Sequence, residues 1–364
     1  MSTPEPVAPD LSGGCLTNVF GAVASRREGV PAWAPPALRD AKQVVLLVLD
    51  GLGWHQLQDR LSVAPQLAGM EGGPITSVAP TTTSAALTSI SLGCAPGEHG
   101  VVGYKISLPG EGVLNVLRWR TDDGAPGVDP EKVQPLTPFA GRPIPVVTKS
   151  FFAGTGFTTA HLRGARLFGW KQPSAIAVEV RHLLEAGEEI VYAYYDGVDH
   201  VAHDAGLGEL YDAELAWTDR LVAGIADVLP PGAALVVTAD HGQVHIGDNT
   251  DEVAADLLAM TTHRSGEARF LWLHASAPVD EVVGRARQLY ADRAWVLTRE
   301  EVVAAGWFGP MAPGVAARLG DVAIVMHDNF AFIDRGEPHE ARLVGRHGSL
   351  TAEEMLVPFV GWRA

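Results

Sequence analysis

The chain has 364 residues, of which 47% are hydrophobic, 19% charged and 7% aromatic, and it carries two cysteines and a net charge of -16. This composition excludes a disordered chain, which would have few apolar residues, and a disulfide scaffold, which would have many cysteines. The acidic excess disfavours a nucleic acid polymer as a partner, because phosphate backbones attract basic surfaces. We therefore expect a soluble globular protein.

The N-terminal segment gives no sign of a targeting signal. Residues 1–10 are polar and rich in proline, and they lack the basic and apolar regions of a secretory signal. We expect a cytoplasmic protein without a membrane partner, since the longest apolar runs are too short to cross a bilayer. Residues 1–40 are expected to form an N-terminal extension ahead of the core.

Short apolar runs alternate with helical patterns from residue 43 onward. The runs Gln43–Leu49, Ile190–Tyr195 and Ala234–Thr238 are typical of strands buried on both faces. Apolar residues recur at helical spacing in Ala175–Ala186 and Glu209–Leu229. This alternation predicts an α/β fold, with a central mainly parallel sheet and helices on both of its faces.

Two stretches depart from this rhythm. Residues 104–174 are rich in glycine and proline, and we expect an irregular insertion there. Residues 266–306 read as a small unit of strand, helix, strand and helix over Arg269–His274, Val279–Ala291, Ala294–Thr298 and Arg299–Ala305. We expect this unit to be an α+β cap inserted into the core, which then comprises residues 41–265 and 307–364.

Acidic and histidine side chains follow several expected strands. Asp50 directly follows the first strand, Asp240 and His241 follow the strand that ends at Thr238, and His347 precedes a glycine near the C-terminus. Because ligands of an open α/β sheet gather at the carboxyl ends of its strands, we expect these side chains to face one cleft. Each motif alone is also typical of an ordinary turn, and only the recurrence of such motifs after several strands indicates a shared site.

The segment after Ile190–Tyr195 offers two pairs of Asp and His spaced four residues apart. In a helix, Asp199 and His203 would share one face and could bind one cation, and the same holds for Asp196 and His200. Oxygen and nitrogen donors without cysteine suit zinc or manganese. Together with the other acids and histidines they are sufficient for two neighbouring cations, an arrangement that serves phosphoryl transfer.

Hydroxyl side chains crowd the segment 80–88, where a strand expected over Ile75–Val78 gives way to a helix. A threonine at the start of that helix would lie where an anion is stabilised, and a bound metal ion would lower the pKa of its hydroxyl. Threonine and serine are also ordinary N-caps, so the segment by itself equally fits a helix start.

Taken in chain order, these motifs resemble the alkaline phosphatase superfamily and, within it, the type I phosphodiesterase/nucleotide pyrophosphatase family. The resemblance spans about residues 43 to 360 and rests on Asp50-Gly, Pro80-Thr-Thr-Thr83, His99-Gly100, Asp199-x-x-x-His203-x-x-Gly206, Asp240-His241-Gly242 and His347-Gly348. In that family the nucleophile lies in Pro-Thr-x-Thr, followed at a fixed interval by Pro-x-x-His-Gly.

The resemblance implies a metal-dependent phosphoester hydrolase that forms a covalent phospho-threonine. The interval from Pro80 to Pro96 implies Thr83 as the nucleophile, with Thr82 as the alternative. Two divalent ions are implied, zinc first and manganese as the alternative. One ion would be held by Asp50, Thr83, Asp240 and His241, and the other by Asp199, His203 and His347. The positions of Tyr194 and Gly206 favour Asp199 and His203 over Asp196 and His200.

The implied substrate is a small-molecule phosphoester. We favour diesters over monoesters, because the sequence offers no further cluster for a third metal ion and no evident arginine for a dianion. The alternatives are a phosphomonoesterase or a phosphomutase of the same superfamily, and a non-catalytic protein that binds a metal or ligand. A sulfatase would require Cys-x-Pro-x-Arg where Thr83 stands. The oligomeric state is not indicated.

Overall fold

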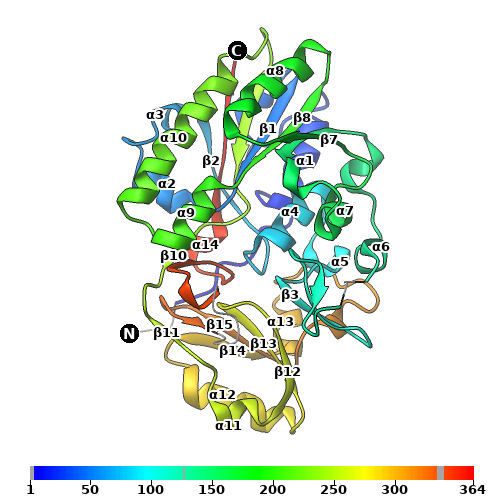
Figure 1. The fold of residues 1–364 in the computed structure, drawn as a ribbon, viewed down its shortest axis with the longest axis vertical. Helices are drawn as coiled ribbons and strands as arrows, with labels where there is room; N and C mark the ends of the chain where they lie inside the picture. Colours follow the sequence, from blue (N-terminus) through cyan, green and yellow to red (C-terminus); the bar gives the residue numbers. More distant parts are fainter. Residues whose placement is uncertain (1–3, 126–127, 334–339) are drawn as a thin grey trace.

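The protein is described by a computed structural model over residues 4–125, 128–333 and 340–364 (Figure 1). A 7-stranded main sheet has the order β2-β18-β9-β1-β8-β6-β7. Its strands are β1 (Val44–Leu49), β2 (Glu71–Thr76), β6 (Pro145–Lys149), β7 (Arg166–Trp170), β8 (Ile190–Tyr195), β9 (Ala234–Thr238) and β18 (Leu356–Arg363).

The centre of the main sheet matches the expected strands. β1 lies between β8 and β9 and is parallel to both, and all residues of these three strands are buried. β6 and β7 continue the parallel arrangement, whereas β18 is antiparallel to both β9 and β2. The predicted α/β fold with a mainly parallel central sheet is confirmed. Because β9, β1 and β8 are parallel neighbours, the residues that follow them meet at one edge of the sheet.

Helices cover the main sheet in two groups. α8 (Ile176–Glu185) and α3 (Pro65–Ala68) pack against α10 (Glu209–Ala226), whereas α1 (Leu16–Ala24) and α7 (Gly156–Leu162) pack against α4 (Thr83–Leu92). In Figure 1 α10 and α3 lie to the left of β1, and α7 lies on the opposite side. The buried face of α1 therefore joins the expected N-terminal extension to the core. Within the described segments, no helix is both long and apolar enough to cross a membrane.

A second 7-stranded sheet has the order β14-β15-β13-β12-β3-β4-β5 and is antiparallel throughout. The elements expected in residues 266–306 occur as β13, α12, β14 and α13, but the sheet extends well beyond that unit. Its members are β3 (Lys105–Leu108), β4 (Gly112–Asn115), β5 (Arg120–Thr121), β12 (Thr261–Gly266), β13 (Phe270–Ala275), β14 (Ala294–Thr298) and β15 (Val322–Met326), with α12 (Val279–Tyr290) and α13 (Arg299–Ala304).

The expectation of an irregular insertion over residues 104–174 is wrong. This stretch supplies β3, β4 and β5 to the second sheet and β6 and β7 to the main sheet. These strands have only two to five residues and are separated by glycine and proline turns, so their periodicity is too short to recognise. The strand expected over Ile75–Val78 is also displaced, because β2 ends at Thr76 and an irregular turn leads into α4.

Further short helices and strands complete the described chain. The helices are α2 (Trp54–Gln58), α5 (Pro96–His99), α6 (Pro130–Val133), α9 (Gly197–Ala205), α11 (Ala255–Leu258) and α14 (Ala352–Met355). The paired short strands are β10 (Val244–His245) with β17 (Gly345–Arg346) and β11 (Thr250–Asp251) with β16 (Ala331–Phe332). Pairing of β10 with β17 brings the segment after His241 beside the segment that carries His347.

Candidate active site

Acids and histidines converge at the carboxyl edge of the main sheet. Asp50 follows β1, Asp240 follows β9, and α9, which carries Asp199, follows β8. Potential ligand atoms of Asp50, Asp240 and His241 lie within 4.8 Å of one another, as do those of Asp199, His241 and His347. His241 belongs to both groups, so the two clusters are immediate neighbours.

The first cluster surrounds the Nε2 atom of His241. This atom lies 3.5 Å from Oδ1 of Asp50, 3.4 Å from Oδ2 of Asp240 and 3.2 Å from Oγ1 of Thr83. Both of these carboxylate oxygens are buried and have no hydrogen-bond partner within the described residues. Unpartnered buried carboxylate oxygens are costly, and a divalent cation between them would satisfy both.

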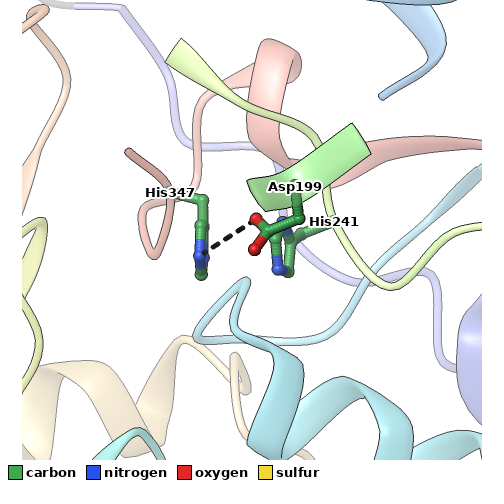
Figure 2. Close-up of side chains that lie close together, drawn as sticks. All are labelled: Asp199, His241 and His347. Atoms are coloured by element: carbon green, nitrogen blue, oxygen red, sulfur yellow. Dashed lines mark ion pairs between the residues drawn. The ribbon is translucent and has the colours of Figure 1, made fainter. Parts of the chain in front are cut away.

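The second cluster lies around the carboxylate of Asp199. Its Oδ1 atom is 3.3 Å from Nε2 of His203 and 3.9 Å from Nε2 of His347. Figure 2 shows the Asp199 carboxylate pointing toward the ring of His347. The rings of His347 and His241 stack with their centroids 3.6 Å apart, which places the two clusters side by side.

Each of the three histidines is oriented by a backbone carbonyl on its Nδ1 side. Nδ1 lies 2.8 Å from the oxygen of Gly345 in His203, 3.0 Å from that of Gly242 in His241 and 2.7 Å from that of Thr81 in His347. Since a carbonyl only accepts hydrogen bonds, Nδ1 must carry the proton in each ring. The lone pair of Nε2 then faces the cluster, as in histidines that bind metal ions.

Burial and neighbouring charges shift the pKa values of two histidines and two carboxyl groups in the clusters. Burial lowers the pKa of His203 to about 4, and burial together with His241 and His203 lowers the pKa of His347 well below its usual value. Burial raises the pKa of Asp199 to about 7, and burial with the carboxylates of Asp240 and Asp199 raises that of Asp50 well above its usual value. A cation would offset this repulsion.

Two cavities meet at Thr83. One, of about 590 Å³, extends toward the second sheet and is lined by Thr83, Asp199, His203 and His347 together with polar side chains such as Tyr104. The other, of about 250 Å³, is lined on the main-sheet side by Thr83, Asp50, Asp199 and a group of aromatic side chains, namely Phe151, Phe152, Phe157, Tyr192 and Tyr194. The Thr83 side chain therefore lines two chemically different spaces.

A family model described as type I phosphodiesterase/nucleotide pyrophosphatase matches residues 44–350. The chain belongs to this family. The match includes β1 and every residue of the two clusters. Family membership identifies the protein as a phosphoester hydrolase of the phosphodiesterase/pyrophosphatase type, and the acid and histidine clusters provide candidate metal sites in this family member.

Solved structures support the same fold at low sequence identity. Murine ectonucleotide pyrophosphatase/phosphodiesterase 5, as an inactive variant in complex with AMP, has a TM-score of 0.65 at 14% identity, covering 88% of this chain and 87% of that one. Phosphonoacetate hydrolase from Sinorhizobium meliloti 1021, in complex with phosphonoformate, has a TM-score of 0.64 at 19% identity, covering 88% and 90% of the two chains. No curated protein sequence matches the chain.

The structure brings together every residue that the sequence nominated for the two ion sites of this phosphodiesterase family member. The alternative pair does not join them, because Asp196 binds the ammonium group of Lys149 at 2.7 Å and the His200 side chain is 69% exposed. Thr83, rather than Thr82, has its hydroxyl against His241. The assignment of metal ligands to these residues stays a prediction.

The structure adds two hydrogen bonds to the expected ligands that the sequence did not predict. The phenol of Tyr194 donates to Oδ2 of Asp50, and the amide of Gln243 donates to Oδ1 of Asp199. Gly51 has a φ of 76°, and a Cβ there would lie 2.9 Å from the Cα of Asp199. The sequence contained only a weak indication of these hydrogen bonds. Tyr194 has the pattern of an ordinary strand residue, and Gln243 is distinguished only by its position after Asp-His-Gly.

We expect Tyr194→Phe to weaken metal binding while preserving the fold. The substitution removes the hydrogen bond that orients Asp50 but keeps the buried ring. Loss of such an outer partner typically lowers metal affinity or activity by about 10- to 100-fold. Calorimetric titration of the metal-free protein with zinc would measure the change. Tyr192→Phe is the matched control, since Tyr192 is a neighbouring buried tyrosine on β8; an equal loss in both variants would contradict the assignment.

Proposed function

We propose that this protein hydrolyses small-molecule phosphodiesters through a covalent intermediate on Thr83, supported by two divalent ions. The observation that carries the proposal is the position of the Thr83 hydroxyl, 3.2 Å from Nε2 of the one histidine that both clusters share. The donor set, with carboxylates and imidazoles and no cysteine, favours zinc, with manganese as the alternative.

The residues of the two clusters would bind two separate ions. Asp50, Asp240, His241 and Thr83 would hold one ion, and Asp199, His203 and His347 the other. When bound, the ions would lower the pKa of the threonine hydroxyl and neutralise charge on the reacting oxygens. Thr83 lies at the first position of α4, so the backbone N–H groups of that helix start face the anionic substrate.

The reaction would proceed in two displacements. Oγ1 of Thr83 attacks phosphorus, and the bond from phosphorus to the first alcohol breaks in line with this attack. Water then attacks the phospho-threonine, which releases the monoester and restores the threonine hydroxyl. The residues of the clusters would hold the attacking and the leaving oxygen in one small, partly buried space. This confinement favours the in-line arrangement of the two oxygens about phosphorus.

The two cavities support a diester over a monoester. A diester carries two organic substituents on one phosphorus, and cavities of about 590 and 250 Å³ open on either side of Thr83. One substituent would occupy the larger and more polar space near the second sheet, and the other the aromatic space beside β6 and β8. A monoester would leave one of these spaces without substrate.

The test compares two chromogenic esters. Purified protein supplied with zinc or manganese is expected to cleave bis(p-nitrophenyl) phosphate with a kcat/KM at least about tenfold above that for p-nitrophenyl phosphate, because each occupied cavity adds binding energy. The products of diester cleavage should be p-nitrophenol and p-nitrophenyl phosphate. Preference for the monoester would favour a phosphomonoesterase, and no cleavage of either ester with either metal would favour a non-catalytic binding protein.

A further inference from the structure

A buried ion pair joins the second sheet to the segment that carries His347. Arg269 directly precedes β13, and Glu354 lies in α14; both side chains are 0% exposed. The guanidinium donates two hydrogen bonds to the carboxylate, from Nε at 2.8 Å and from Nη2 at 2.9 Å. Its Nη1 donates to the backbone oxygens of Asp328 and Phe330. All three guanidinium nitrogens of Arg269 thus donate hydrogen bonds, which fixes the orientation of the group.

The remaining hydrogen bonds of Glu354 reach both ligand segments. Its Oε1 accepts the backbone N–H of Ser349, two residues after His347, at 2.9 Å. Its Oε2 accepts the hydroxyl of Thr351 at 2.6 Å. Its backbone oxygen accepts the N–H of Gly242, the residue after His241, at 2.8 Å. One glutamate therefore fixes the segments that carry two of the three histidines.

The segment that carries His347 is also hydrogen-bonded to Thr81, in the turn that leads into Thr83. The N–H of Gly348 donates to the hydroxyl of Thr81 at 3.0 Å, and that hydroxyl donates to the oxygen of Ser349 at 2.7 Å. The backbone oxygen of Thr81 in turn accepts the Nδ1 proton of His347 at 2.7 Å. A shift of the 347–351 segment would therefore move His347 and disturb the turn that leads into Thr83.

We propose that Arg269 and Glu354 are positioning residues, which set the spacing between the two ligand segments and tie that spacing to the second sheet. The inference rests on the proposed metal site. Apolar residues of similar volume would give equal or greater stability than a buried ion pair, so general stability does not explain these directed bonds. Their geometry explains them, because the carboxylate's hydrogen bonds to Ser349 and Thr351 hold Glu354 itself in place, and the backbone oxygen of Glu354 in turn holds Gly242.

The experiment separates positioning from stability with three variants of the full chain. Arg269→Met leaves the charge of Glu354 buried without its partner, and Arg269→Met combined with Glu354→Leu removes both charges. Arg299→Met is the control, because it breaks the ion pair of Arg299 with Asp321, which lies within the second-sheet region and touches no ligand segment. Each protein is stripped of metal and titrated calorimetrically with zinc, its thermal unfolding is recorded, and kcat and KM are measured on bis(p-nitrophenyl) phosphate.

The single variant at Arg269 is expected to lose about tenfold or more in zinc affinity and a similar factor in kcat, with KM little changed. The double variant is expected to unfold at a higher temperature than the single variant, because no unpaired charge stays buried, but not to recover zinc affinity. It provides the test if the single variant does not fold. Zinc affinity and kcat in the double variant equal to those of the unsubstituted protein, or an equal loss in Arg299→Met, would overturn the inference. Absence of zinc and manganese binding by the unsubstituted protein would instead overturn the metal site, and the inference with it.

Discussion

Replacing Thr83 with alanine is expected to reduce phosphodiester cleavage by about 10⁴- to 10⁶-fold, the range seen when a covalent nucleophile is removed. The physical reason is that alanine has no oxygen to form the phospho-enzyme, whereas the carboxylates and histidines of both clusters stay in place. Thr83 lies at the start of α4 with its hydroxyl against His241, and its methyl group does not contribute to this contact. Initial rates on bis(p-nitrophenyl) phosphate would measure the loss.

Two further variants make this result specific. Thr83→Ser keeps an oxygen at the same position and should retain substantial turnover. Thr82→Ala removes the alternative nucleophile and should lower the rate far less than Thr83→Ala. Zinc titration of Thr83→Ala should still detect binding at both clusters, since six carboxylate and imidazole ligands are unchanged. A loss of turnover in Thr82→Ala, with normal rates in Thr83→Ala, would assign the reaction to the neighbouring hydroxyl.

Removal of metal ions is expected to abolish activity and to lower stability together. Without cations the carboxylates of Asp50, Asp240 and Asp199 repel one another at close range, and burial raises the pKa of Asp50 and Asp199. A ligand that binds only the folded protein stabilises it by about 4 kcal/mol when its free concentration is 1,000 times Kd. Dialysis against a chelator, followed by thermal unfolding and rate measurements, tests both effects.

Return of zinc or manganese should restore activity and unfolding temperature in parallel. Asp240→Asn serves as the control, because it removes a ligand charge at the centre of the first cluster and should show a smaller metal-dependent rise in unfolding temperature. The proposed two-ion site would be contradicted if chelation left the rate unchanged. It would also be contradicted if zinc restored the rate without any measurable binding to the purified protein.

The sequence by itself determined the centre of the fold and most of the site. The apolar runs at β1, β8 and β9 are strong signals because strands buried on both faces need apolar side chains at every position. Asp50 comes directly after β1 and Asp240 two residues after the end of β9, so their convergence follows from parallel pairing. The spacing of Asp199 and His203 on one helix face is likewise a local property.

Tertiary structure decided the features that depend on contacts between distant residues. The ion pair of Asp196 with Lys149 from another strand adds support to the preference for Asp199 that the resemblance implied, and this contact was not visible in the sequence. β3, β4 and β5 were not recognised, because strands of two to four residues take their stability from neighbours in the second sheet rather than from their own pattern. Arg269 and Glu354 are 85 positions apart along the chain. Their pairing could not be predicted from the sequence, because a contact between distant charges does not affect the local periodicity.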